Sequence, residues 1–487
     1  MMRSLYSGVS GLKVHQTKMD VIGNNISNVN TVGFKSSQVN FSDVLYQTTS
    51  SASGPNAEAG TAGTNAKQIG LGASVASISN TMSVSGGSQR TDNALDIMIE
   101  GDQFFVVNNG TQNYFTKAGA FTVDANGVLC TASGYKVMGW QVDPMDASKC
   151  VQDTVSELRV MGPEAMYVEP VATKNTYFSG NIDYKDSQLQ SGTGKTSTMN
   201  FYDNLGQSYM AIVTIAEAPD QSDEGTRTYK LKVTDILDSK GDSIFVTKTV
   251  DETDGSISYA PSSITTFGWG PECDDQSVEV DEEGNVNIEM EGIDLKFSRE
   301  TGKFVSVGTE EGEKSISFKA DGASAENSPF QMIDVDFSSM TMYASSGSSS
   351  FSSARGSVTD GKGAGKPQGN MTGMSVDTSG RIYGTYDNGD NKLLCQIAVA
   401  SFANPAGLEA VGNSLFAQTM NSGDFDGVGE DISTSGGKMK TGVLEMSNVD
   451  LSTEFTQMIT TQRGFQANSR IITTSDTLLE ELINLKR

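Results

Sequence analysis

This chain of 487 residues has little of the material from which catalytic centres and disulfide frameworks are built. Histidine occurs once, as His15, so a histidine-based catalytic triad is not expected. The four cysteines are far apart in the sequence: Cys130, Cys150, Cys273 and Cys395. They form no metal-type pair, and their density is too low for a disulfide framework. We therefore expect free thiols or incidental residues at these positions.

Positive charge and long hydrophobic runs are also scarce. The chain has 34 Lys and Arg against 60 Asp and Glu, a formal net charge of −26, which argues against nucleic acid as a partner. The same acidity keeps separate copies soluble and apart until a stronger attraction overcomes it. No segment near Met1 has the apolar core of a signal peptide, and no run is long enough to span a membrane. We expect no membrane insertion and no conventional signal-peptide secretion, which leaves export by another route open.

The composition is that of turn-rich β structure. Hydrophobic residues make up only 36% of the chain, glycine is abundant at 52 residues, and proline is low at 10. Short apolar alternations begin near Ile69, and the turns Asn108–Gly110 and Asp124–Gly127 predict hairpins. A second β-rich stretch covers about 144–366, and a short helix is expected at about 406–411.

Apolar residues spaced by seven mark both ends of the chain. The rows consist of Leu5, Leu12, Met19 and Ile26 near the N-terminus and of Leu451, Met458, Phe465, Ile472 and Leu479 near the C-terminus, with Phe455 on a second row. This period predicts long helices laid against another helix, over about 4–28 and from Leu451 onward. The second helix would extend roughly 50 Å. These ten side chains are the predicted assembly seam.

Apolar heptads usually mark the core of a single chain, but two features favour assembly here. The C-terminal stretch is a poor helix by itself, with seven threonines between Leu451 and Leu479 and Gly464 in the middle. It also has apolar side chains outside the narrow seam, which one partner helix would leave uncovered: Ile459, Ala467, Ile471, Leu478 and Leu482. The helical ends are therefore predicted to meet other copies of the chain.

The order of these segments predicts a nested, mainly β, multi-domain chain with paired N- and C-terminal α-helices. Its Ser/Ala/Gly/Thr-rich tract at about 47–68 has the composition of a linker. The predicted parts are a terminal helical domain at 1–34 plus 441–487, a linker segment ordered on assembly at 35–75, a β-rich inner domain at 76–144 plus 369–440, and a β-rich outer insertion at 145–368, undivided or in two subdomains.

Three short motifs resemble chemical sites but fail on spacing or context. Ser191–Thr196 lacks the first glycine of a phosphate loop, because Leu189 occupies that position. Asp424–Gly427 resembles part of a calcium loop, but Ser433 stands where a bidentate glutamate is needed. His15 has mostly polar neighbours and no placeable triad partner. We predict no catalytic, cofactor-binding or metal-binding residue, no cofactor, and a protein that is not an enzyme.

Two stretches near the ends are specific enough to indicate a family. Residues 24–35 read Asn-Asn-Ile-Ser-Asn-Val-Asn-Thr-Val-Gly-Phe-Lys, and residues 462–470 read Gln-Arg-Gly-Phe-Gln-Ala-Asn-Ser-Arg. They resemble the terminal signatures of the bacterial flagellar rod and hook protein family, and residues 95–105, 118–127 and 400–408 resemble its β module. The signature residues are Asn24, Asn25, Asn28, Asn30, Thr31, Gly33, Phe34, Lys35, Asn448, Asp450, Gln462 and Arg463.

The resemblance implies a structural subunit of the flagellum. The long middle of this chain is similar to that of the family's hook subunits, which implies a curved helical tube that acts as a flexible universal joint between motor and filament. The terminal coiled-coil-like helices would be innermost around a channel and the β insertions outermost. Implied partners are further copies of the chain, rod and hook–filament junction proteins, the hook cap and the flagellar export apparatus. The implied location is the extracellular hook of the basal body, reached without a cleaved signal peptide.

Two alternatives remain beside this interpretation. A distal rod or hook-associated axial protein of the same family would carry similar signatures, and a straight polymer would identify it. A secreted β-rich adhesin or enzyme, anchored by its helices, predicts converging carboxylates or aromatic residues within 145–366. The sequence shows no such constellation.

Overall fold

The computed structural model describes residues 2–55, 60, 62–218, 225–250, 257–262, 267–270, 277–281, 286–290, 292–308, 312–320 and 329–485. The chain divides into two compact units. The first comprises Met1–Met166, Thr372–Thr385 and Asn391–Arg487, and the second comprises Tyr167–Met371 and Tyr386–Asp390. The predicted inner and outer β domains, divided at 144/145 and 368/369, stay predictions.

The predicted thiols can be placed at three of the four positions. Cys395 is buried, Cys130 and Cys150 are half-buried, and all three are free cysteines. Cys273 lies outside the described residues. The interpretation of the cysteines as free thiols therefore holds for the three that the structure describes.

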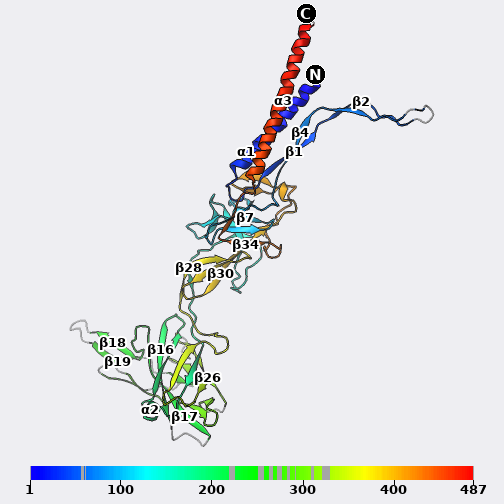
Figure 1. The fold of residues 1–487 in the computed structure, drawn as a ribbon. Coiled ribbons are helices and arrows are strands. Elements are labelled where there is room, and N and C mark those ends of the chain that lie inside the picture. The colour runs from blue at the N-terminus through cyan, green and yellow to red at the C-terminus, as the bar shows by residue number, and fades with distance from the viewer. Residues whose placement is uncertain are drawn as a thin grey trace. The chain divides into compact units, whose positions relative to one another are not determined.

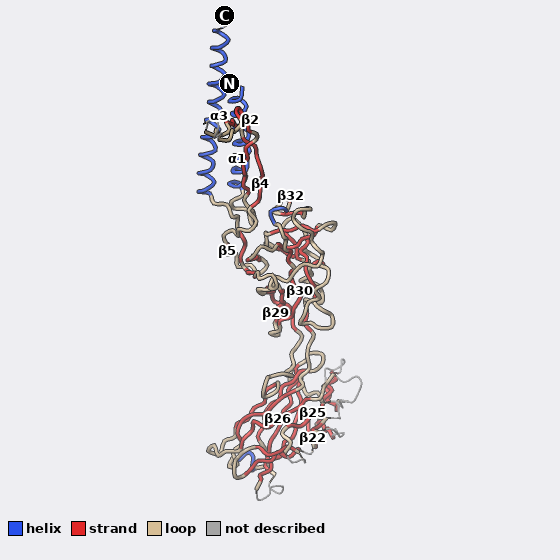
Figure 2. Tube along the Cα trace, turned by 90° about the vertical axis from the view of Figure 1, so that its right-hand side faces the viewer, coloured by secondary structure: helices blue, strands red, loops and turns tan. Residues whose placement is uncertain are grey.

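Two long helices of the first unit, α1 (Met2–Ser27) and α3 (Leu451–Leu485), run antiparallel and side by side (Figure 1). Ser4 Oγ lies 3.4 Å from Ser475 Oγ, and α3 continues beyond this point (Figure 2). Both predicted terminal helices are confirmed. Among the described residues, no helix combines the length and the hydrophobicity needed to cross a membrane.

A two-stranded arm stands beside the helices (Figure 1). Its strands pair antiparallel, β1 (Ser37–Asp43) with β4 (Ala73–Asn80) and, farther out, β2 (Tyr46–Ser50) with β3 (Lys67–Gly70). The sequence predicted a linker at 35–75. The described part of that segment forms this ribbon instead, because its backbone N–H and C=O groups find partners across the two strands. That the segment orders on assembly stays a prediction.

The β body of the first unit contains the predicted hairpins. β7 (Phe104–Asn108) pairs with β8 (Asn113–Thr116), and Gly110 in the turn adopts a φ of 94°. Phe104 and Phe115 each meet the ring of Phe402 edge to face, at centroid distances of 6.0 and 4.7 Å. The other strands are β5 (Ser88–Arg90), β6 (Ile97–Glu100), β9 (Phe121–Val123), β10 (Leu129–Thr131), β11 (Lys136–Gln141), β12 (Ser156–Glu157), β29 (Arg381–Tyr386), β30 (Asn391–Ile397), β31 (Val399–Ala400), β34 (Lys438–Thr441) and β35 (Val443–Glu445).

The prediction of a short helix at about 406–411 is wrong. The chain makes a single 3₁₀ turn, η2 (Pro405–Gly407), and then enters β32 (Glu409–Gly412), which pairs with β33 (Leu415–Ala417). Asn413 and Ser414 between these strands have φ values of 53° and 56°. Two consecutive residues with positive φ form the tight reversal of a hairpin, so the segment cannot continue as a helix.

The second unit consists mainly of two sheets that share one core. Phe178 and Val335 of one sheet and Val213 and Leu231 of the other are fully buried in the same cluster, so the sheets pack face to face. The first sheet has the order β20 (Gly268–Trp269), β25 (Ser315–Lys319), β26 (Ile333–Thr341), β14 (Asn175–Asn181) and β27 (Ser350–Arg355). The second has the order β15 (Lys195–Tyr202), β16 (Ser208–Glu217), β17 (Thr226–Leu237), β23 (Ile293–Ser298) and β24 (Phe304–Val307).

Shorter elements complete the second unit. They are α2 (Ser187–Gln190), β13 (Tyr167–Val168), β18 (Val246–Val250) paired with β19 (Ile257–Pro261), and β21 (Ser277–Val280) paired with β22 (Val286–Glu289). Figure 1 labels α2, β18 and β19 among them. β28 (Gly369–Val376) is divided between the two units.

Candidate assembly site

Glycines let the two terminal helices approach closely. A Cβ added at Gly11 of α1 would lie 2.6 Å from the side-chain nitrogen of Asn468, and one added at Gly464 of α3 would lie 2.7 Å from the imidazole of His15. At Gly8 an added Cβ would lie 3.2 Å from Ile472. A larger side chain at these positions would therefore require Asn468, His15 or Ile472 to shift.

One predicted seam residue, Ile472, lies at this contact, because a Cβ added at Gly8 would lie 3.2 Å from it. Leu5, Leu12, Met19, Ile26, Met458, Phe465, Ile472 and Leu479 are half-buried. Leu451 and Phe455 are exposed, at 39% and 49% of their surface. The most buried residues of α3 are Thr461 and Ser475, on a row of small and polar side chains that also includes Glu454 and Asn468. A hydrophobic pattern gave no signal for that row.

Apolar side chains remain uncovered on the outer faces of the helix pair. On α3, Ile459, Ile471, Leu478, Leu482 and Ile483 are exposed, at 59, 42, 52, 50 and 67%. On α1, Met2, Tyr6 and Val9 are exposed at 63, 66 and 54%. Monomeric proteins rarely expose so many large apolar side chains on neighbouring turns of helix, so these faces are candidates for contact with another chain.

The base of the helix pair is the region where α1 ends, at Ser27, and α3 begins, at Leu451. There Asn25 joins three segments. Its side chain is 1% exposed, and its Nδ2 donates to the carbonyl oxygen of Ser37 and to Oε1 of Glu454, both at 2.9 Å. The backbone N–H of Ser37 donates back to Asn25 Oδ1 at 3.0 Å. This one amide thus connects the end of α1, the start of the arm and the first turn of α3.

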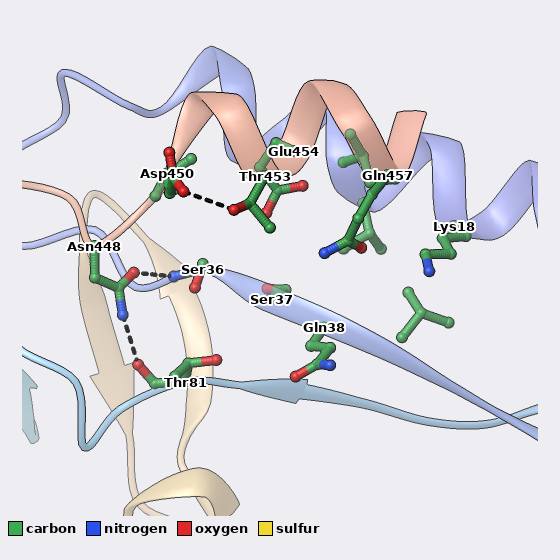
Figure 3. Close-up of a pocket in the computed structure, with 14 residues that line it drawn as sticks. Lys18, Ser36, Ser37, Gln38, Thr81, Asn448, Asp450, Thr453, Glu454 and Gln457 are labelled. Carbon is green, nitrogen blue, oxygen red and sulfur yellow. Dashed lines mark hydrogen bonds between the residues drawn. The ribbon is translucent and has the colours of Figure 1, made fainter. Parts of the chain in front are cut away.

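A second amide, Asn448, connects the chain just before α3 to the arm (Figure 3). The N–H of Ser36 donates to Asn448 Oδ1 at 2.7 Å, and Asn448 Nδ2 donates to the carbonyl oxygen of Thr81 at 2.9 Å. Asp450 then caps α3, because its carboxylate accepts from the N–H of Ser452 and from Oγ1 of Thr453. These hydrogen bonds hold the pKa of Asp450 below its usual range, so the cap is ionised at neutral pH.

Lys35 and Glu445 form a buried ion pair below these amides. Lys35 Nζ lies 2.9 Å from Glu445 Oε1, and the two side chains are 1% and 0% exposed. Lys35 also donates to the carbonyl oxygen of Val84, and Glu445 accepts from the N–H of Gly86. Removing one partner of such a pair leaves a buried charge uncompensated, at a cost of about 3–5 kcal/mol. Sequence reasoning missed Glu445, because its partner is 410 positions away.

Gly33 brings the two ends of the chain together at the same place. Its N–H donates to the carbonyl oxygen of Glu445 at 2.8 Å, and its φ is 68°. A Cβ here would lie 2.6 Å from the backbone nitrogen of Ala118. Glycine is required both by the backbone conformation and by the lack of space.

Lys117, which the sequence did not single out, is buried beside this ion pair. Its Nζ donates to the carbonyl oxygen of Gly101 at 2.6 Å and lies 5.1 Å from the centroid of Phe104. Burial lowers the pKa of Lys117 to about 8, while the charge of Glu445 acts in the opposite direction. The cluster at the base is therefore a structural one, closed off from solvent.

The remaining signature residues divide into two groups. Thr31 Oγ1 donates to Asn28 Oδ1, and Asn28 Nδ2 donates to Asn24 Oδ1, so these three shape the turn after α1. The others make no such cluster: Phe34 is half-buried, and Asn30, Gln462 and Arg463 are exposed. The structure thus brings together the signature residues of the base but not those in the middle of α3.

Two cavities lie at the base of the helix pair. One, of about 220 Å³, is lined by residues of α1, β1 and α3 that include Lys18, Gln38, Glu454 and Gln457 (Figure 3). The other, of about 460 Å³, lies between the turn after α1 and the β32–β33 hairpin. Within the described ranges, no three His, Cys, Asp or Glu side chains are grouped so that they could hold a metal ion.

Three family models match the chain at its ends and in its first β module. They are described as Flagella basal body rod protein, matching residues 5–35, Flagellar hook protein FlgE/F/G D1 domain, matching residues 98–162, and Flagellar basal body rod FlgEFG protein C-terminal, matching residues 440–485. The first match covers most of α1 and the turn after it, and the last covers all of α3.

Curated relatives match over the whole chain. It is 36% identical over 497 residues to the flagellar hook protein FlgE of Borreliella burgdorferi and 33% identical over 504 residues to that of Treponema pallidum. It is 28% identical over 487 residues to the flagellar basal-body rod protein FlgG of Bacillus subtilis. Each comparison covers 100% of both chains. The crystal structure of the Helicobacter pylori flagellar hook protein FlgE2 matches with a TM-score of 0.34 and 15% identity, over 74% of this chain and 100% of that one.

Proposed function

Because the chain belongs to the flagellar hook protein family and is a structural subunit of the hook, we propose that it self-assembles into a curved helical tube. The tube acts as a flexible universal joint that transmits torque from the motor and rod to the filament. The family is a structural one, so the proposal needs no catalytic residue and no cofactor.

The observation that carries the proposal is the uncovered apolar surface of the helix pair. Leu478, Leu482 and Ile483 are exposed in the single chain although α3 is ordered around them. Burying a fully exposed side chain of this size is worth about 1.5–3 kcal/mol, and since these are already partly covered, each would contribute roughly half of that to an assembly. A tube with the terminal helices innermost covers these side chains with neighbouring copies, and the predicted seam from Leu5 to Leu479 then lies between subunits.

The same arrangement assigns roles to the rest of the chain. The β body of the first unit surrounds the helices, and the insertion lies outermost. Close helix packing makes the inner tube stiff, while sliding contacts between outer β domains allow it to bend. The chain is exported without a cleaved signal peptide by the flagellar export apparatus, and it meets rod proteins, hook–filament junction proteins and the hook cap at the ends of the tube.

Electron microscopy of the purified, polymerised protein tests this function. We expect hollow tubes with a defined curvature. A straight tube would favour the rod alternative, to which the 28% identity with the rod protein FlgG over the whole chain gives specific support. Protein that stays monomeric at high concentration, in the presence of preformed hook fragments as seeds, would contradict the proposal.

A further inference from the structure

The outer half of the arm, residues 44–50 and 67–70, is exposed at every position. It nevertheless carries apolar side chains: Val44, Leu45, Tyr46 and Ile69 are exposed at 50, 62, 53 and 45%. An isolated two-stranded ribbon is only marginally stable in water. Contact with another protein surface would therefore stabilise this outer arm by covering its apolar side chains.

A receiving surface exists at the base of the helix pair. The cavity of about 460 Å³, here called the junction cavity, has an apolar wall that includes Phe34, Leu415 and Phe416. The amides of Asn24 and Asn28 also line it. A group that suits this cavity has an apolar body and one polar end, which is the character of a tyrosine side chain.

The arm of the same chain cannot fill its own junction cavity. Ser37 lines that cavity at the start of β1, and Tyr46 is nine residues farther along the ribbon. At about 3.3 Å per residue, Tyr46 lies on the order of 30 Å away. Farther along the ribbon, Gly72 lies against Ser10 and Ser7, so the arm runs away from the base and along α1.

We infer that Tyr46 of one copy docks in the junction cavity of a second copy. A protrusion that fits a pocket elsewhere on an identical molecule makes a head-to-tail contact, and repeated contacts of this kind produce an open helical filament. The ring of Tyr46 lies beside Gly70, where an added Cβ would lie 3.5 Å from it, and it remains 53% exposed. The tyrosine hydroxyl then meets the lining amides of Asn24 and Asn28. This inference rests on the proposed self-assembly and adds the contact that links the copies.

Site-specific photo-cross-linking in the polymer tests the contact directly. Tyr46→p-benzoylphenylalanine is irradiated after assembly, and the cross-linked peptides are identified by mass spectrometry. We expect cross-links to residues 24–37 or 410–416 of another copy. Gln47→p-benzoylphenylalanine is the matched control, because neighbouring residues of a strand point to opposite faces. Cross-links from position 46 only to other segments, or only within its own chain, would overturn the inference while leaving the proposed function intact.

Two pairs of variants provide an independent measurement, the critical concentration for polymerisation. Tyr46→Ala should raise it at least tenfold and Gln47→Ala should not. Ala410→Phe, which fills the junction cavity, should raise it similarly, whereas Val411→Phe at the adjacent exposed position should leave it unchanged. Unchanged values for Tyr46→Ala and Ala410→Phe would overturn the inference. Wild-type protein that never polymerises would overturn the proposed function, and this contact with it.

Discussion

At the scale of single residues, the contact between α1 and α3 depends partly on glycine and histidine positions that a hydrophobic pattern cannot identify. His15 of α1 lies against Gly464 of α3, and its ring meets Phe41 of the arm edge to face at 5.9 Å. Its Nδ1 is buried without a hydrogen-bond partner among the described residues. Lys18 lies one turn farther along α1, and its positive charge disfavours a second positive charge on His15. The site therefore suits a neutral imidazole.

This geometry makes the stability of the helix pair depend on pH. Desolvation, and next the charge of Lys18, lower the pKa of His15 below its usual value of 6.5. The unfolded chain then binds a proton at a higher pH than the folded chain does. Stability is therefore full above about pH 6.5 and falls as the pH drops below it. Thermal unfolding followed by circular dichroism between pH 7.5 and 5.5 should show this loss.

The matched variant for this test is His15→Gln, which removes the only histidine of the chain. Its unfolding temperature should change much less over the same pH range, because its carboxylates and amines titrate mostly outside it. Equal pH dependence in the two proteins would show that His15 is not the responsible group.

Replacing two helical glycines, Gly23 and Gly464, with alanine should change the stability in opposite directions. Alanine gains up to about 1 kcal/mol over glycine inside a helix. Gly23→Ala should show this gain, because an added Cβ meets no atom within 4 Å. Gly464→Ala should destabilise the helix pair instead, since the new Cβ would lie 2.7 Å from His15. Thermal unfolding of both variants distinguishes the outcomes, and equal stabilisation would contradict close packing at Gly464.

At the scale of elements, the sequence predicted the terminal helices but not the surface by which they meet. Heptad spacing located α1 and α3, because an apolar stripe with the helical period reflects burial along a helix. Of the residues at the contact, Ile472 lies on the heptad row, whereas Gly11, Asn468 and Ser475 carry no hydrophobic signal. The arm was missed for a related reason: its strands are held by backbone pairing, and the Ser/Ala/Gly/Thr-rich tract at about 47–68, which overlaps its outer strands, has the composition of a linker. The ion pair of Lys35 and Glu445 joins positions that no local pattern connects.

The part of α3 that passes Ser475 should serve assembly rather than folding. Leu482→Asp places a charge on an apolar side chain that is 50% exposed in the single chain. The monomer should unfold at the same temperature as wild type, while polymerisation should be lost because the charge would be desolvated between subunits. Thr477→Asp adds the same charge at an exposed polar position and is the control. Normal tubes from Leu482→Asp would place this face in solvent.

At the scale of the whole molecule, the chain enters and leaves its large insertion at nearly the same point. Within the second unit, Val168 of β13 pairs with Gly369 of β28, and Tyr167 pairs with Asn370. Paired residues of neighbouring antiparallel strands lie about 5 Å apart, so a short linker can replace everything between them. The second unit also has a core of its own.

Excision of the insertion tests whether the nested organisation is real. A chain in which a short Gly-Ser linker joins Val168 directly to Gly369 should keep the helix pair and still polymerise, with an altered curvature, since it lacks the outermost contacts. Electron microscopy gives the curvature, and circular dichroism gives the helix content. A shortened chain that folds but forms no tubes would show that the insertion is needed for assembly itself.

The antiparallel pairing of α1 with α3 also has a consequence for how a subunit is completed. Ser4 and Ser475 meet across 471 positions of sequence, so the first helix lacks its partner helix until the last one has been made. A chain broken off before α3 leaves Asn25 without Glu454 and His15 without Gly464. Such a fragment cannot present the finished base to a neighbour. Only a chain that includes α3 can therefore form the complete helix pair, so a truncated subunit lacks the surface that assembly requires.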